Sequence, residues 1–490
     1  MAGAGQRVLQ LLPINEMPSH ETSPYSALSA MAVDPQFITL ADLEDCAALG
    51  GERALDADLQ ARLGEARAAV AVDYTAVRAF KEVVLRRCFG RFLEIEWNAQ
   101  TRRADSLRDY LEDQAWWLDE YALFRALRTR YRQRPWTEWS QPIRDHEPAA
   151  LAMARRELAE DILYRQYLQW VAGDQWAAAR RACGGVALFG DLPYMVSGDS
   201  ADVWARQGEF RLDMSVGVPP DAFSETGQDW GFPAYRWDVV ASGDYRWLCD
   251  RARRNADLFD GYRVDHVVGF YRTYSRPLDG RAGRFTPEDQ ASQLEQGEQV
   301  LAALRGPGTE IIAEDLGSVP DFVRESLVRQ GIPGYKVLRW ERAWHREGQP
   351  FLDPAEYPAE SVATTGTHDT EPMAVWWAGA SEEQREAVLA IPSLQSRLSS
   401  EDRLRGRRDP GLTTPVRDAV IETLYASGSE LLILPVQDVF GWTGRINQPA
   451  TTEASNWTWR LPWLVDRWSE EPEATAAAAR LQNWSRKYAR

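Results

Sequence analysis

Short apolar runs recur along the chain, and each is bounded by charged or turn-forming residues. Runs of this kind, rich in Val, Ile and Leu, are typical of strands that are buried on both faces of a parallel sheet. We predict seven such strands, at residues 8–13, 186–190, 261–265, 310–314, 335–340, 361–366 and 431–436.

Between the first two predicted strands the pattern becomes helical. Residues 41–181 are dominated by Ala, Leu, Arg and Glu, and the segment 113–124 has the apolar spacing of an amphipathic helix. Residues 382–425 and the tail also predict helices. In contrast, the stretch 191–238 is rich in Gly, Pro, Asp, Ser and Trp, and we predict a long irregular segment there, which in a compact domain is usually functional.

Strands that alternate with helical segments predict an α/β fold, here a (β/α)₈ TIM barrel with a large helical insertion. We expect residues 1–40 and 182–463 to form the barrel, residues 41–181 to form an inserted helical subdomain, and residues 464–490 to form a C-terminal helix. A closed barrel has eight strands, whereas the pattern gives seven, so either one strand escapes the pattern or the chain lacks the first strand.

Three of the predicted strands lead directly into carboxylates. Asp265 and Glu314 close two of them, and Asp369 follows a third within a few residues. Acids at the C-terminal ends of parallel barrel strands lie at the catalytic face of such a barrel. A nucleophile, a proton donor and a third carboxylate that stabilises positive charge are what retaining glycosidic chemistry needs.

The neighbours of these acids fit that interpretation, although each also has a structural one. Arg263 lies two residues before Asp265, so on a strand both side chains point the same way and the guanidinium can orient the carboxylate. A structural Arg–Asp pair would look the same. Glu314 could instead cap the next helix, and His368 beside Asp369 is weak evidence taken alone.

The composition narrows the range of partners. A net charge of −17 argues against nucleic acid and anionic membranes, whereas a neutral substrate is compatible with it. The 21 tryptophans include flat faces that could carry sugar rings, although most tryptophans fill cores. The four cysteines lie far apart and the five histidines form no metal-binding motif, so we expect no disulfide, no metal and no cofactor. No signal peptide or membrane-length apolar stretch is present, which favours a cytoplasmic protein.

Longer segments around these residues resemble those of one family. They are, in order, residues 23–30, 190–194, 199–204, 217–224, 226–231, 263–266, 312–317, 331–338, 365–369, 437–439 and 445–449. The set resembles the amylomaltases, 4-α-glucanotransferases of the α-amylase superfamily, and it spans about residues 5 to 463.

The resemblance implies an enzyme that transfers α-1,4-glucan segments to the 4-OH of glucose or a maltooligosaccharide with retention of configuration. α-1,4-Glucans and maltooligosaccharides are then the expected partners. Asp265 would be the nucleophile, Glu314 the acid/base and Asp369 the residue that stabilises the transition state. The implied substrate-binding residues are Tyr25, Asp199, Arg263, His266, His368, Trp230 and Asn447.

Within that set the resemblance distinguishes two regions. Tyr25 would stack on the −1 sugar, with Arg263 and His368 around it, and Asp199 would bind a hydroxyl in the same region. His266 would lie near the +1 sugar. Loops within residues 191–238 would form the acceptor site, and residues 217–231 resemble a mobile loop that folds over it and shields the intermediate from water.

The chain also departs from the family pattern. Residues 1–7 align with the end of the family's first helix, so we expect the missing strand to be the first and the chain to be shorter by one βα unit of about 30 residues. Phe232 and Thr370 stand where Asn is usual, the segment before Gly217 is short, and residues 448–451 replace an Arg-Pro-Gly-Thr-like run. These changes concern acceptor handling, so the preferred chain length stays open.

Two alternatives accompany this interpretation. An α-1,4-glucan hydrolase on the same scaffold would use the same three acids, and only residues 217–231 favour transfer over it. A catalytically silent glucan-binding protein could result from the loss of a barrel strand, although all three acids are present. The oligomeric state is not predicted by the sequence.

Overall fold

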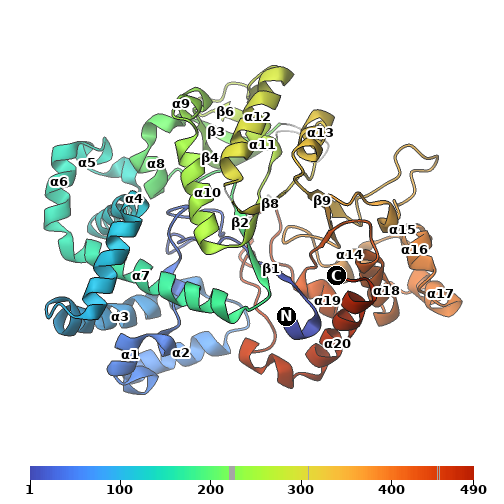
Figure 1. The fold of residues 1–490 in the computed structure, drawn as a ribbon, viewed down its shortest axis with the longest axis horizontal. Helices are drawn as coiled ribbons and strands as arrows, with labels where there is room; N and C mark the ends of the chain where they lie inside the picture. Colours follow the sequence, from blue (N-terminus) through green and yellow to red (C-terminus); the bar gives the residue numbers. More distant parts are fainter. Residues whose placement is uncertain (220–226, 307, 450, 452) are drawn as a thin grey trace.

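The computed structural model describes residues 1–219, 227–306, 308–449, 451 and 453–490. At its centre is a curled sheet of seven parallel strands with helices around it (Figure 1). In spatial order the strands are β1 (Val8–Gln10), β2 (Ala187–Leu192), β5 (Gly261–Val264), β8 (Glu310–Ala313), β9 (Gly334–Val337), β10 (Ser361–Thr364) and β11 (Leu431–Leu432). All seven predicted strands are present in the order of the chain, although β1, β9 and β11 end earlier than predicted.

Apolar side chains from most of these strands meet inside the curl. The buried members of this cluster come from β2, β8, β9 and β10, and side chains of β1 and β11 pack against it; the set is Val8, Phe189, Ile312, Tyr335, Val337, Val362 and Leu431. A sheet filled by side chains from its own strands is the barrel core that the fold class requires.

Two glycines allow aromatic rings to lie across neighbouring strands. Phe189 of β2 is the register partner of Gly261 on β5, and a Cβ atom on Gly261 would lie 2.6 Å from the Phe189 ring. A Cβ atom on Gly190 would lie 2.4 Å from the ring of Phe259. Only glycine leaves room for these rings, so the two positions fix how β2 and β5 pack.

The sheet is open between β1 and β11, each of which pairs with a strand on one side only within the described residues. Hydrogen bonds join the residues just before β1 to two helices from the C-terminal part of the chain, α18 (Thr414–Tyr425) and α20 (Pro472–Lys487). Gln482 Nε2 donates to the Gly3 carbonyl at 3.0 Å, Ser485 Oγ donates to the Gly5 carbonyl at 3.2 Å, and Gln6 Nε2 donates to Tyr425 Oη at 2.8 Å. We call this set of contacts the N-terminal clasp.

The predicted helical insertion between β1 and β2 is present. Its helices are α1 (Glu44–Ala48), α2 (Ala57–Ala68), α3 (Tyr74–Phe92), α4 (Arg102–Arg130), α5 (Gln141–Arg144), α6 (Pro148–Glu157) and α7 (Ala159–Ala182). Asp56 and Asp73 cap α2 and α3 by accepting hydrogen bonds from the first-turn amides of Leu59 and Ala76. The insertion lies to one side of the sheet (Figure 1), and its treatment as a separate subdomain stays a prediction.

The remaining helices follow β2. They are α8 (Ala201–Ala205), α9 (Trp237–Ser242), α10 (Arg246–Leu258), α11 (Val268–Tyr271), α12 (Gln290–Leu304), α13 (Asp321–Arg329), α14 (Met373–Gly379), α15 (Glu382–Leu389), α16 (Pro392–Gln395), α17 (Ser400–Arg408), α18 (Thr414–Tyr425), α19 (Val436–Phe440) and α20 (Pro472–Lys487). The helices predicted at 382–425 and in the tail are thus present. No described helix combines the length and the apolar character needed to cross a membrane.

The prediction of an irregular segment at 191–238 was wrong in part. A second, antiparallel sheet contains β3 (Phe210–Val218), β4 (Gln228–Tyr235), β6 (Thr273–Pro277) and β7 (Arg284–Thr286), in the order β4-β3-β6-β7. Strands are recognised in a sequence by a buried apolar face. β3 and β4 lack a clear one, because they contain glycine, proline and exposed polar residues, so the sequence did not predict them. Part of the predicted mobile loop, residues 220–226, lies outside the described residues.

Gly5 offers a test of the N-terminal clasp. It adopts a left-handed conformation with φ 73°, and a Cβ atom there would lie 2.9 Å from Ser485. We expect Gly5→Ala to lower the free energy of unfolding by about 1–2 kcal/mol, because a side chain disfavours this conformation and would push α20 away. Urea unfolding measures the change. Gly3→Ala is the matched control, since a Cβ atom on Gly3 meets nothing within 4 Å, and equal behaviour of the two variants would contradict the expectation.

Candidate active site

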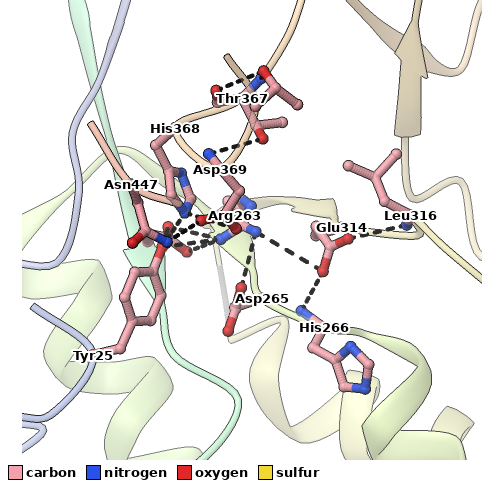
Figure 2. A network of polar contacts seen from close by, with 12 residues as sticks. Tyr25, Arg263, Asp265, His266, Glu314, Leu316, Thr367, His368, Asp369 and Asn447 are labelled. Carbon is pink, nitrogen blue, oxygen red and sulfur yellow. Dashed lines mark hydrogen bonds and ion pairs between the residues drawn. The ribbon is translucent and has the colours of Figure 1, made fainter. Parts of the chain in front are cut away.

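Arg263 of β5 lies at the centre of a polar network at the C-terminal ends of the strands (Figure 2). The sheet register places it opposite Asp191 of β2. Its side chain is 5% exposed, and its guanidinium nitrogens lie 2.7 Å from Asp191 Oδ2, 2.9 Å from Asp265 Oδ1 and 3.8 Å from Glu314 Oε2. One buried cation therefore holds three carboxyl groups from three adjacent strands.

Glu314 follows β8 directly and is fixed by backbone amides. The amide of His266 donates to Glu314 Oε2 at 2.8 Å, and the amide of Leu316 donates to Oε1 at 3.1 Å. Burial raises the pKa of Glu314 well above its usual range, while Arg263 and the two amides act in the opposite direction. Glu314 is thus a carboxyl group that keeps its proton at a higher pH than a free glutamate does.

Asp369 has the opposite character. Asn447 Nδ2 donates to Asp369 Oδ1 at 2.6 Å, and His368 Nε2 lies 3.4 Å from Asp369 Oδ2. Burial alone would raise the pKa of Asp369, but His368 and Asn447 outweigh it and lower this pKa to about 2. Asp369 is therefore an anion at any pH near neutrality, close to a carboxyl group that is not readily ionised.

Tyr25 connects the two sides of the network. Its hydroxyl donates to Asp191 Oδ2 at 2.7 Å and lies 3.1 Å from His368 Nε2. The Tyr25 and His368 rings are stacked, with centroids 5.7 Å apart. Tyr25 and His368 from the loops after β1 and β10 thus share one set of polar contacts with Asp191 of β2 and Arg263 of β5, and Figure 2 shows Tyr25, His368 and Arg263 side by side.

The loop that carries Tyr25 is held by buried acids on either side of it. Glu16 accepts hydrogen bonds from Tyr121 Oη and, at 3.0 Å, from Arg125 Nε, both on α4. Asp202 of α8 accepts from the Ala30 amide at 2.7 Å. Glu16 thus ties the segment to α4, and Asp202 ties it to α8. These hydrogen bonds fix the position of a segment that has no regular secondary structure of its own.

Comparison with known proteins agrees with this architecture. The model of the 4-alpha-glucanotransferase family matches residues 1–466. The 4-alpha-glucanotransferase of Thermus thermophilus is 33% identical over 478 residues, which are 94% of this chain and 88% of the relative. That of Synechocystis is 32% identical, over 96% of this chain and 89% of the relative. The chain belongs to the 4-alpha-glucanotransferase family.

A solved structure supports the same conclusion. The amylomaltase from Streptococcus agalactiae, determined in complex with acarbose, superposes with a TM-score of 0.81 at 26% sequence identity, covering 99% of this chain and 92% of that one. The resemblance to amylomaltases inferred from the sequence is confirmed, as is the TIM-barrel class of the fold.

Most of the residues expected to serve a 4-alpha-glucanotransferase gather at one place. The network contains Tyr25, Arg263, Asp265, Glu314, His368, Asp369 and Asn447. His266 and Trp230 lie beside it, with ring centroids 4.8 Å apart in an edge-to-face arrangement. His266 has a positive φ of 43°, and burial lowers its pKa to about 4, so its ring is neutral near pH 7.

Asp199 does not join this network. Its carboxylate lies 2.5 Å from Arg128 Nη1 and accepts a hydrogen bond from the Trp136 amide at 3.2 Å, both from the helical insertion. The sequence interpretation overlooked Asp191, which instead contacts Arg263 and Tyr25. Asp191 directly follows the predicted strand 186–190, which is the same signal that identified the other acids.

No three His, Cys, Asp or Glu side chains in the described ranges are arranged to hold a metal ion. Arg263, which is permanently ionised, supplies positive charge in this site. Preorganised charge of this kind can stabilise developing charges without reorganisation.

Because Arg263 is shared by several buried acids, its removal should make the stability of the protein depend on pH. We expect Arg263→Met to lower the free energy of unfolding by about 3–5 kcal/mol, because it leaves buried carboxylates without their cation. Burial already raises the pKa values of Asp191 and Glu314, which Arg263 opposes, so its removal raises them further. A folded-state pKa above the unfolded one means that stability falls as pH rises through the folded value, so the loss is larger at pH 8 than at pH 5.

Urea unfolding at the two pH values measures this effect. Arg211→Met is the matched control, because Arg211 pairs at 3.1 Å with Asp213 at an exposed position, where an ion pair contributes about 0–1 kcal/mol. A loss that is equal at pH 5 and pH 8 would show that Arg263 does not compensate the buried acids.

Proposed function

We propose that this protein is a 4-alpha-glucanotransferase that transfers α-1,4-glucan segments to the 4-OH of glucose or of a maltooligosaccharide. The observation that carries the mechanism is that one guanidinium nitrogen of Arg263 contacts both Asp265, at 2.9 Å, and Glu314, at 3.8 Å. Both carboxyl groups therefore lie around the same nitrogen, an arrangement that fits the close pair of a retaining glycosidase better than the wider gap that inverting enzymes leave for water.

In the first half of the reaction Asp265 is the nucleophile and Glu314 is the acid. Glu314 protonates the glycosidic oxygen of the leaving glucan, a role that its raised pKa supports. Asp265 attacks the anomeric carbon and forms a covalent glucosyl-enzyme. Arg263 and the Tyr194 amide, which donates to Asp265 Oδ2 at 3.4 Å, orient the attacking carboxylate.

In the second half the acceptor replaces the leaving group. Glu314, now ionised, takes the proton from the acceptor 4-OH, whose oxygen attacks the anomeric carbon and releases Asp265. Two inversions at this carbon give net retention. Asp369, with its lowered pKa, is the anion that stabilises the positive charge of both oxocarbenium-like transition states.

The aromatic and polar residues around the acids bind the sugars. Tyr25 offers a ring to the −1 sugar, with Arg263, His368 and Asn447 around it. Trp230 on β4 packs against His266, which supports an acceptor role for the β3–β4 region near the +1 sugar. The Asp199 carboxylate is bonded to Arg128 and Trp136 of the insertion, and these contacts do not support a direct contact between Asp199 and a sugar.

The substrate class and the cellular location are also part of this proposal. A net charge of −17 suits neutral α-1,4-glucans better than nucleic acid or an anionic membrane, and we propose a cytoplasmic location for the protein. Among the alternatives, the family relationship favours transfer over hydrolysis or silent binding.

Incubation with maltotriose tests the reaction class directly. We expect a ladder of longer oligosaccharides together with glucose, while the total number of reducing ends stays nearly constant, because transfer makes one glycosidic bond for each that it breaks. Product lengths and reducing ends are followed in the same samples. Reducing ends that rise with time, with only glucose and maltose as products, would identify a hydrolase instead.

Asp265→Asn tests the enzymatic interpretation against a silent glucan-binding protein. We expect turnover to fall by about 10⁴-fold or more, since an amide cannot form the covalent intermediate. Binding of maltooligosaccharides, measured by calorimetry, should be retained. Asp105→Asn, a change of the same type at an exposed position of α4, serves as the control and should leave turnover unaffected. Turnover in Asp265→Asn that equals that of the control would overturn the assignment.

A further inference from the structure

A third aromatic ring lies behind the two that take part in the polar network. The Trp457 ring centroid is 5.6 Å from that of Tyr25 and 5.6 Å from that of His368. Tyr25 and His368 also contact each other, so the three rings form a closed cluster. Tyr25 and His368 contribute polar atoms to the network, and both of their rings contact the ring of Trp457.

The backbone of Trp457 is held in an unusual conformation. Its φ is 66°, in the left-handed region that a bulky residue rarely adopts. Hydrogen bonds on both sides impose it: the Trp457 amide donates to the Ile446 carbonyl at 2.7 Å, and the Tyr74 hydroxyl donates to the Trp457 carbonyl at 2.7 Å. Strained residues persist only where their surroundings determine them, and such positions cluster at functional sites.

Tyr74 belongs to the helical insertion, not to the barrel. It is the first residue of α3, and the end of α2 together with the turn that follows it makes further contacts with the same segment. The Val72 amide donates to the Thr458 carbonyl at 2.9 Å, and Arg460 Nη1 donates to the carbonyls of Ala66 and Ala69 at 3.0 and 2.8 Å. We call these contacts, with the bond from Tyr74, the rim clasp.

Trp457 also borders a cavity, so contacts to its backbone are needed to hold its ring in place. Trp457 and Tyr74 both line an apolar cavity of about 460 Å³, together with Leu12, Pro24 and Trp176. Trp457 is only partly buried, so its ring has Tyr25 and His368 as neighbours and is not enclosed by protein on all sides. A ring that is packed incompletely can rotate away from its neighbours, so its position depends on how firmly its backbone is held.

We propose that Trp457 is a positioning residue for glucan transfer and that Tyr74, from the helical insertion, holds it in place. Trp457 keeps the Tyr25 hydroxyl and His368 Nε2 at 3.1 Å from each other, and thereby keeps both aligned on Asp191 and Asp369. Without the ring, Tyr25 and His368 can tilt into the cavity, and the site loses the alignment that the transition state requires. This inference rests on the proposed transferase function.

The test uses Trp457→Ala, Trp457→Phe and Tyr74→Phe in the maltotriose assay. We expect kcat to fall about 100-fold in Trp457→Ala with little change in KM, because alignment matters most in the transition state. Trp457→Phe should recover part of this loss. Tyr74→Phe, which removes one oxygen atom and keeps the ring, should lower kcat about 5- to 10-fold.

Two matched controls separate positioning from general packing. Trp97→Ala removes a ring from the insertion that packs on Phe92 and Arg108, and Tyr245→Phe removes a hydroxyl that donates to Gln299 between α10 and α12. Neither residue contacts the network, so both variants should keep wild-type kcat. Thermal unfolding of all variants verifies that each is folded at the assay temperature.

The double variant decides whether the two residues act together. If Tyr74 acts on the reaction through Trp457, then Tyr74→Phe has no further effect on kcat once Trp457 is Ala. Multiplied losses in the double variant, or wild-type kcat in both Tyr74→Phe and Trp457→Phe, would overturn the proposal. Absence of transfer by the wild-type protein would instead contradict the proposed function, so the two failures are distinguishable.

Discussion

The site depends on placing one permanently charged guanidinium among several buried carboxyl groups. Arg263 contacts Asp191, Asp265 and Glu314 from the interior side of β5, and each of these acids comes from its own strand end. Taking charges out of water is costly unless they are paired and hydrogen-bonded. The strand register and the backbone amides that face Glu314 supply this pairing, so a shift of one strand would disrupt the network as a whole.

The open edge of the sheet explains why so much of the chain outside the strands matters to the site. Within the described residues β1 and β11 are not paired with each other, and segments that precede or follow β1 in the sequence contact segments that precede or follow β11. The N-terminal clasp joins the segment before β1 to α18 and α20, and the rim clasp joins the insertion to residues 457–460. If Trp457 positions Tyr25 and His368 as proposed, the helical insertion supports the site through the rim clasp.

Much of the fold and the centre of the site could be predicted from the sequence. The parallel strands are continuous apolar runs, and their C-terminal ends must meet at one rim, which is why Asp265, Glu314 and Asp369 were identifiable. The antiparallel sheet was not, because strands such as β3 have several exposed polar residues and a short apolar face. Asp191 and Asp199 lie close in sequence, and only the register with β5 shows which of them faces Arg263. The conformation of Trp457 has no sequence signal, since it arises from contacts with distant residues.

The two clasps also have a consequence for the order in which the molecule is assembled. The contact of Gln482 with Gly3 spans 479 positions of the sequence, and that of Tyr74 with Trp457 spans 383. Contacts between such distant residues form late in folding, because the loop-closure entropy must be overcome before they contribute. During synthesis, Tyr25 and the insertion leave the ribosome long before the segment that supports them. The catalytic arrangement therefore becomes complete only after almost the whole chain has been synthesised, and partly synthesised chains carry the acids without their alignment.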